Sequence, residues 1–511
     1  MKHTNQILAY AALLCFMCVS QTFAQGFGDP LTFQGLSHTT TQSVASRALG
    51  GISFGFKNDV SLMFSNPASL TTLKGLQVSI GGLQQYTYMK QDQLYGGLQG
   101  HSAFSLLTEA ATGEISDPDT NLTFNGKKVT LTTQADSVQR PFDAIGPNWN
   151  RSKSNSLPVQ VFVAAPFTIS NIQMVGGLGV VQYANLDWYY QNNNCFSPSV
   201  LSVVDSTVST SGLNANPYLT QWYQYYQQRN GQIYGYGGAL SAALNERLSV
   251  GISFLLLKGS TDDEEVRVGR GQMQFFTNSL RLTKQGMSSF TKTGTSDYSG
   301  TEFSVSAEYR SQYFDCGFAV KLPTTITRKY SMNIWTDSVA ATEVYAGRVD
   351  SVHVSTTSSV SGQDKIALPL QGRFGFGIRI KENFTIGIDY EIRSYASAEY
   401  TSSGGSVSNP WLSSSVLHLG GEYRVAPWLA LRGGVYTFSE VFQPITEALR
   451  GDPVSYPVYS LGCGLKIVGG TLDVTYEYSD MKYVDTWSNA ASINQGITNN
   501  VVASFSYTTP W

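Results

Sequence analysis

The chain has 511 residues, of which only 14% are charged, and its formal net charge is −3. Ordinary soluble domains carry about 25% charged residues, so this composition, with 49 glycines and 29 tyrosines, favours strands, turns and interfaces over helices. Because neither sign of charge dominates a long stretch, nothing in the sequence points to nucleic acid as a partner.

The first 24 residues have the pattern of a secretory signal peptide. Lys2 precedes an apolar run over residues 7–19, and cleavage is expected after Ala24, just before Gln25. Beyond this leader no apolar stretch approaches the ~20 residues that a membrane-spanning helix needs. A mature chain that crosses a membrane must therefore cross it with strands.

Residues 25–75 do not follow the strand pattern of the later chain and are rich in Gly, Ser and Phe. They contain a run of the form D-x-S-x-x-F-x-N-P-A-x-L, whose matching positions are Asp59, Ser61, Phe64, Asn66, Pro67, Ala68 and Leu70. This run resembles the N-terminal plug of the FadL/TodX (OmpP1) family of outer-membrane transporters for hydrophobic compounds. The resemblance implies a barrel of about fourteen strands, closed by an N-terminal hatch that rearranges to let ligand diffuse through without a cofactor.

The hatch implied for residues 25–75 carries the first candidate site. Glycines at positions 50, 51 and 55 allow its backbone to change conformation at low steric cost. The candidate residues of a ligand path are Phe54, Phe56, Phe64, Asn66, Pro67 and Ala68. The phenylalanines either offer apolar contact to a lipid-like guest or only pack the hatch against the wall, and the sequence leaves both interpretations open.

From residue 76 onward, apolar and polar residues alternate with a period of two over long runs. Between Arg373 and Ile380, for example, two phenylalanines and two isoleucines occupy one face, while arginines and glycines occupy the other. Since successive side chains of a strand point to opposite faces, each segment has one apolar and one ionisable face. The ionisable residues expected in the lumen, mutually paired because unpaired buried charge is costly, are Arg373, Arg379, Arg393, Arg424 and Arg432 with Asp389, Glu391, Glu422, Asp473 and Glu477.

Very short turns join the strands at one end and long polar segments join them at the other, which is the arrangement of bacterial outer-membrane barrels. Strands are predicted at 76–90, 157–166, 172–190, 230–244, 248–260, 300–310, 313–335, 367–380, 384–398, 414–425, 428–440, 457–467, 471–480 and 499–511. The predicted fold is all-β: a transmembrane antiparallel barrel of about 14 strands over residues 76–511, with the hatch, residues 25–75, in its lumen. The expected location is the outer membrane of a Gram-negative cell.

The long loop expected over residues 191–229 carries a second candidate site. Leu219, Trp222, Tyr223 and Tyr226 have the i, i+3, i+4, i+7 spacing of one helix face. Outside the barrel such an aromatic stripe would collect hydrophobic molecules before they enter, or it would form the packing surface of the loop.

No catalytic, cofactor or metal-binding pattern is convincing. Residues 51–55 match G-x-S-x-G but lack the strand–turn–helix context of a nucleophile, and a lipid hydrolase with His418 as its base is the weakest alternative. The predicted function is passive, hatch-gated uptake of hydrophobic small molecules such as long-chain fatty acids or aromatic hydrocarbons. Expected partners are these molecules, outer-membrane lipid, and the barrel assembly machinery during biogenesis. The alternative is a binding or scaffold barrel that holds or shuttles secreted surface proteins.

Overall fold

The computed structural model describes residues 35–36, 38, 41–55, 59–94, 123–124, 127–128, 145, 148–197, 215–275, 280–345, 348–442, 454–467, 469–487 and 490–510. The predicted signal peptide, residues 1–24, and Phe56 lie outside these ranges. Within these ranges, no helix combines the length and hydropathy that crossing a membrane requires.

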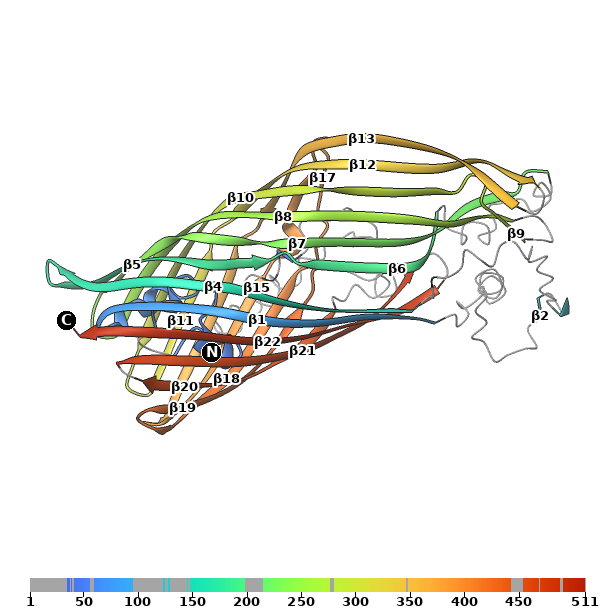
Figure 1. Ribbon diagram of the computed structural model, residues 1–511. Coiled ribbons are helices and arrows are strands. Elements are labelled where there is room, and N and C mark those ends of the chain that lie inside the picture. The colour runs from blue at the N-terminus through green and yellow to red at the C-terminus, as the bar shows by residue number, and fades with distance from the viewer. Residues whose placement is uncertain are drawn as a thin grey trace, which may run out of the picture.

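Fourteen antiparallel strands close into a barrel (Figure 1), which confirms the predicted fold. In order around the wall they are β1 (Gly75–Leu94), β4 (Trp149–Ile169), β5 (Ile172–Asn185), β7 (Tyr218–Ala243), β8 (Leu248–Phe275), β10 (Ser288–Arg310), β11 (Phe314–Lys321), β14 (Gln371–Lys381), β15 (Phe384–Arg393), β18 (Ser414–Ala426), β19 (Leu429–Ser439), β20 (Ser455–Ile467), β21 (Gly470–Trp487) and β22 (Ala490–Pro510). The last strand, β22, pairs with β1 from Gly75↔Pro510 to Leu94↔Ala491, and this ladder closes the ring.

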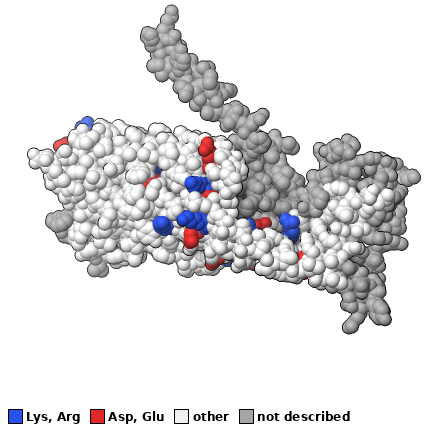
Figure 2. All heavy atoms as spheres, turned by 90° about the horizontal axis from the view of Figure 1, so that it is seen from above, with Lys and Arg blue, Asp and Glu red and all other residues white. Residues whose placement is uncertain are grey.

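The alternation along the strands places apolar side chains on the outside of the barrel and ionisable ones inside. Leu178, Ile80 and Leu461 are 60–67% exposed on the outer face, whereas the inward-facing Asp389 and Glu477 are buried. Figure 2 shows a face of the molecule on which charged side chains are absent from wide areas and gather in a few groups. A continuous apolar band of this kind is stable when lipid surrounds it, since each exposed apolar Å² in water costs about 25 cal/mol.

The wall is much taller on one side than on the other. Beyond the apolar band, β7, β8 and β10 continue into a sheet that β12 (Thr324–Tyr345) and β13 (Arg348–Leu368) extend (Figure 1). On the other side, the wall strands β14, β15, β18, β19 and β20 are only 10 to 13 residues long. On β8 the outer face changes from Ile252 and Leu256 to Lys258 and Asp262, all exposed. The tall part therefore stands outside the band that lipid would cover.

The long predicted strands 313–335 and 367–380 are each two strands. β11 ends at Lys321 and β12 begins at Thr324, with Pro323 between them. Likewise β13 ends at Leu368 and β14 begins at Gln371, with Pro369 between them. Proline has no N–H to donate to a sheet, so each proline marks the point where the tall sheet separates from the barrel wall.

The loop predicted over residues 191–229 is wrong where the structure describes it. Residues 191–197 belong to β6 (Trp188–Ser197), and β7 begins at Tyr218, so the four residues with helical spacing lie on a strand. β7 pairs with β8 from Tyr218↔Phe275 onward. The tyrosines and tryptophan of this segment have high β propensity, and pairing with a long neighbour outweighs a short helical periodicity.

Inside the barrel lies the N-terminal segment, which carries α2 (Val44–Ala48), η1 (Val60–Leu62) and η2 (Pro67–Thr72). The Ser43 side chain caps α2 by accepting from Ser46 N, and Asp59 caps η1 in the same way. Pro67 opens η2, where its missing N–H has no cost. We call residues 41–55 and 59–73 the hatch; nearly all of their side chains are buried.

The remaining described elements are short. They are the short pair β2 (Thr123–Phe124) and β3 (Lys127–Lys128), then β9 (Leu280–Thr283), η5 (Tyr395–Ser397), β16 (Glu399–Thr401) and β17 (Val407–Ser408). The three-residue strand β16 adds to the edge of β13 through Lys365–Ala367.

Candidate functional site: the hatch and the lumen

One side of the hatch is held by a buried ion pair. Nε of Arg47, in α2, donates to Oε1 of Glu477, on β21, at 2.9 Å, and both side chains are buried. Next to this pair the Thr475 hydroxyl donates to the carbonyl oxygen of Val44 at 2.7 Å. Charged hydrogen bonds are about twice as strong as neutral ones, so this contact anchors α2 to the wall.

A second anchor holds the turn that follows α2. Nη1 of Arg373, on β14, donates to the carbonyl of Gly51 at 3.0 Å and to the Ser53 hydroxyl at 2.7 Å. Its other nitrogen, Nη2, pairs with Glu391 on β15 at 2.5 Å. The Ser53 amide donates to Oδ2 of Asp389 at 2.7 Å. Arg373 therefore binds the hatch and also neutralises the acidic groups that surround it.

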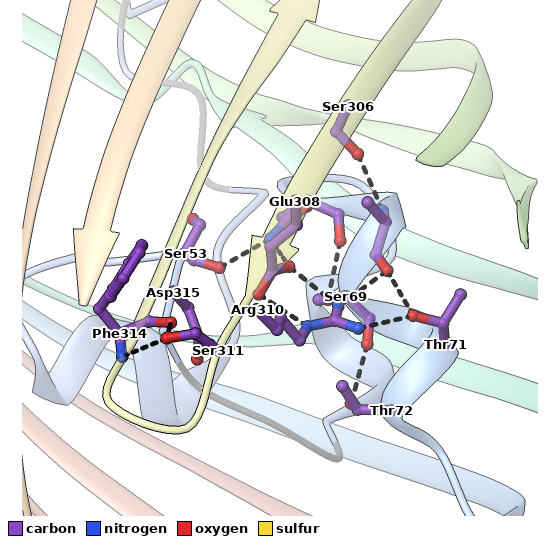
Figure 3. A network of polar contacts seen from close by, with 12 residues as sticks. Ser53, Ser69, Thr71, Thr72, Ser306, Glu308, Arg310, Ser311, Phe314 and Asp315 are labelled. Carbon is purple, nitrogen blue, oxygen red and sulfur yellow. Dashed lines mark hydrogen bonds and ion pairs between the residues drawn. The ribbon is translucent and has the colours of Figure 1, made fainter. Parts of the chain in front are cut away.

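The third anchor holds η2 against β10 (Figure 3). Arg310 donates to the Thr71 hydroxyl at 2.8 Å and to the Ala68 carbonyl at 3.0 Å. The Ser306 hydroxyl accepts from the Ala68 amide at 2.8 Å. Asn66 donates to Glu308 at 2.9 Å and to the Ser53 carbonyl at 3.1 Å. The plug motif thus supplies the polar groups that attach the hatch to β10.

Glycines bring the hatch backbone directly against the wall backbone. Gly50 adopts φ +69°, in the left-handed region that favours glycine. It lies against Gly434 of β19, where an added Cβ would be 2.1 Å from Gly50 N, and Gly420 of β18 meets Leu49 in the same way. The inward-facing glycines of the wall strands therefore form the seat on which the end of α2 rests.

The predicted pairing of lumen charges is confirmed for most of the residues that carry it. Arg393 donates to Glu391 at 2.7 Å, and Arg432 lies between Glu422, at 2.9 Å, and Asp473. Arg379 pairs with Asp315, an acidic partner that the sequence did not single out. The exception is Arg424, whose side chain is 62% exposed at the end of β18, although it also contacts Glu422.

Outward of the hatch, the inside of the barrel contains a large buried apolar cluster, with buried ion pairs such as Lys321–Glu302 and Arg328–Asp364 set into it. On β8, Gly251 meets the hatch at Pro67, whereas Leu255 and Leu257, further from the short turns, belong to a buried apolar cluster. We call this cluster the apolar layer; its wall and loop members include Leu186, Ile233, Leu255, Leu257, Tyr298, Ile326, Ile366, Tyr395 and Trp411. The hatch side chains Met63, Phe64 and Leu70 belong to the same cluster. The hatch therefore packs directly against the apolar layer.

The predicted hatch residues fall into two groups. Asn66, Pro67 and Ala68 face β8 and β10 and serve attachment. Phe64 points into the apolar layer, 5.7 Å from the Phe162 ring. Phe54 is fully buried against Gly317 and Gly375 of the wall.

The predicted capture residues do not form one surface stripe. Leu219 is 44% exposed on the outer face, whereas Trp222 and Tyr223 are buried beneath the guanidinium groups of Arg270 and Arg267. Tyr226 stacks on the Tyr189 ring. Burial raises the pKa values of the Tyr223 and Tyr226 phenols above their ordinary value. Alternation along a strand separates residues that a helix would have placed together.

At one place the tall wall is held together by side chains. β5 ends at Asn185 and β6 begins at Trp188, and residues 149–158 of β4 pair through their backbone with β1 but not with β6. Lys153 reaches Asp187 at 3.1 Å across this seam, and Arg151 lies 4.0 Å above the Tyr189 ring. A cavity of about 50 Å³ lies between them. The sequence did not predict this seam, because a seam becomes visible only where two neighbouring strands do not pair through their backbones.

Comparison with known proteins agrees with this architecture. The family model BamG matches residues 224–426. Among solved structures, a FadL homologue of Pseudomonas aeruginosa aligns with a TM-score of 0.56 and 13% identity, covering 91% of this chain and 98% of the other. The toluene transporters TodX of P. putida and TbuX of Ralstonia pickettii align with TM-scores of 0.52 and 0.51, each at 13% identity, over 92% and 91% of this chain and 99% and 98% of theirs. No curated protein matches the chain in sequence.

A closed barrel with a hatch attached inside defines a hatch-plugged outer-membrane barrel. Within that class the chain has the fold of the FadL-type transporters, as the alignments over nearly the whole length of both chains show. The resemblance drawn from the plug motif is thereby confirmed at the level of the fold.

Proposed function

We propose that this chain is an outer-membrane channel for passive uptake of hydrophobic small molecules, exported with the help of a signal peptide cleaved after Ala24. The observation that carries the proposal is the apolar layer, which lines the lumen outward of the hatch and includes Leu255, Leu257 and Ile366. A porin for polar solutes has a polar, water-filled interior. An apolar layer across the lumen instead favours solutes that gain about 25 cal/mol for each Å² removed from water.

Passage in this proposal requires the hatch to move. The cavity between Phe64 and the wall near Arg373 is only about 30 Å³, while pockets for small ligands are roughly 300–1,000 Å³. The positive φ angles of Gly50, Gly51 and Gly55 place flexible residues where the hatch turns. The hatch is therefore the proposed gate, and its polar anchors set how readily it opens.

Uptake by cells tests the transport proposal. We expect deletion of the gene to slow the uptake of at least one hydrophobic compound among long-chain fatty acids, aromatic hydrocarbons and haem, with uptake restored by the gene on a plasmid. Uptake of a small hydrophilic sugar is the control and should not change. Unchanged uptake of every hydrophobic compound would contradict the channel function.

A reversible lock tests the hatch movement. The hydroxyls of Ser61, in the hatch, and Ser79, on β1, are 3.4 Å apart, so cysteines at both positions place two thiols close enough for a disulfide. We expect S61C/S79C, in a chain whose native cysteines are replaced by alanine, to lose uptake when oxidised and to regain it when reduced. The single variant S61C, treated with the same oxidant, is the control. Normal uptake by protein that mass spectrometry shows to be fully cross-linked would exclude movement of this part of the hatch.

A second candidate function is a scaffold barrel that holds other polypeptides at the cell surface. The observation that favours it is the tall sheet, which rises beyond the apolar band and most of which lies within residues 224–426, the range that matches the BamG family model. Uptake that survives gene deletion, together with a stoichiometric protein partner recovered from membranes, would select this function over transport.

A further inference from the structure

The strand β13 has a long edge that, except at residues 365–367, pairs with no other strand of the described chain. Over its whole length it pairs with β12 on one side, whereas on the other side β16 pairs only with Lys365–Ala367. Every residue from Val352 to Ser361 is exposed, on both faces of the strand. In Figure 1, β13 forms the upper border of the tall sheet.

Between His353 and Gln363, the described part of the chain shows none of the features that normally prevent strand addition. Natural edge strands are protected by lysines, prolines, bulges or a covering segment. From Val352 to Gln363 the sequence has no lysine, arginine or proline, and the register with β12 is regular from Val339↔His353 to Thr324↔Leu368. The short strand β16 already adds antiparallel to the same edge and then turns away after Thr401. Among the residues that the structure describes, the edge therefore pairs with a strand at its base and is unpaired beyond it.

We propose that the edge of β13 over residues 352–361 binds an extended segment of a second polypeptide, which adds to the tall sheet as one more antiparallel strand. Backbone hydrogen bonds supply most of the affinity in this mode of binding, and side chains on alternate positions supply the specificity. This inference rests on the proposed function in one respect only, namely that an outer-membrane barrel would place the edge of β13 at the cell surface.

The side chains of the edge define the kind of segment that fits. Val352, Val354 and Val360 lie on one face and are 49%, 52% and 36% exposed. The other face carries His353 and Ser355, which both bind Asp337 of β12, at 2.7 and 2.8 Å. Cross-strand neighbours stabilise a sheet when apolar side chains meet apolar ones. The partner segment is therefore uncharged and alternates β-branched apolar residues with small polar ones.

A second copy of this chain in the same membrane does not fit the edge. Symmetric dimers of membrane barrels are related by a twofold axis along the membrane normal. Strands tilted by roughly 35–45° from that axis cross their symmetry mates at about 70–90°, so the two edges cannot form a continuous ladder. Lipid does not fit either, because three of the four outer positions of β12 beside this edge, Ser331, Asn333 and Asp337, are polar, and only Trp335, 41% exposed, is apolar.

The test uses the purified full-length protein in lipid nanodiscs and a labelled synthetic dodecapeptide of alternating valine and threonine with a lysine at each end. We expect saturable binding by fluorescence anisotropy, together with amide hydrogen exchange that becomes about tenfold slower or more within residues 352–361 and not elsewhere. The same peptide with a central proline, which cannot pair as a strand, should not bind.

Two matched variants add lysines either on the apolar face of the edge or away from it. V354K/V360K should weaken peptide binding by about tenfold or more, while S331K, an exposed position on the interior strand β12, should leave it unchanged. Absence of slowed exchange in residues 352–361 at saturating peptide, or equal binding by V354K/V360K, would overturn the proposal. Slow exchange of these residues that depends on protein concentration without peptide would assign the edge to a second copy instead. Because the readout is binding to purified protein, its failure is separate from a failure of the uptake test.

Discussion

Replacement of Gly434 by valine is expected to displace the hatch and open the barrel. A Cβ at this position would lie 2.1 Å from Gly50 N and 2.2 Å from the Leu49 carbonyl carbon, both backbone atoms that no side-chain rotation can move away. Overpacking of this kind costs about 1–3 kcal/mol or more, and the hatch can relieve it by leaving its seat. We expect raised conductance in planar bilayers and greater sensitivity of cells to large antibiotics.

The control for this variant lies next to it on the same strand. Gly433 faces away from the lumen, and a Cβ there would meet nothing closer than the Leu461 side chain at 3.5 Å. G433V should therefore leave conductance at the wild-type level, since lipid and a flexible leucine can accommodate the added methyl groups. Equal conductance of G434V, G433V and wild type, with all three correctly inserted, would show that the end of α2 does not seal the barrel.

Replacement of Arg373 by alanine is expected to destabilise the folded barrel more than any other single loss of charge in the lumen. The change removes the donors to Gly51 and Ser53 and the arginine beside the fully buried Asp389, while Glu391 loses one of its two arginine partners. Removing one partner of a buried ion pair costs about 3–5 kcal/mol. Loss of stability should appear as a lower midpoint of unfolding in urea, followed by tryptophan fluorescence in detergent.

Arg424 offers the matched control because it pairs with Glu422 at 2.9 Å while its side chain is 62% exposed. Exposed ion pairs contribute only about 0–1 kcal/mol, so R424A should unfold close to wild type. The variant R373K retains the charge but not the planar set of donors, and it should recover part of the lost stability. If R373A and R424A unfold at the same urea concentration, the Arg373 network does not hold the hatch.

The fold was largely accessible from the sequence because its main determinant is local. Alternation of apolar and polar residues along single strands, as between Arg373 and Ile380, requires lipid on one face and a polar lumen on the other. Strand lengths were underestimated where β7, β8 and β10 continue past the membrane, because the apolar face there ends while the pairing goes on. Helical spacing of the aromatic residues near Trp222 was misleading, since pairing with β8 decides the conformation of that segment.

By itself, the sequence determined the barrel, the approximate number of strands, and a plug motif whose Asn66, Pro67 and Ala68 contact the wall. It could not determine which wall residues receive the hatch, because Arg47 and Glu477 are 430 residues apart and meet only when the ring of strands closes. The open edge of β13 and the seam beside β6 were equally inaccessible to it. An edge is defined by the absence of a neighbour, and neighbours in a sheet are set by tertiary pairing rather than by any property of the strand itself.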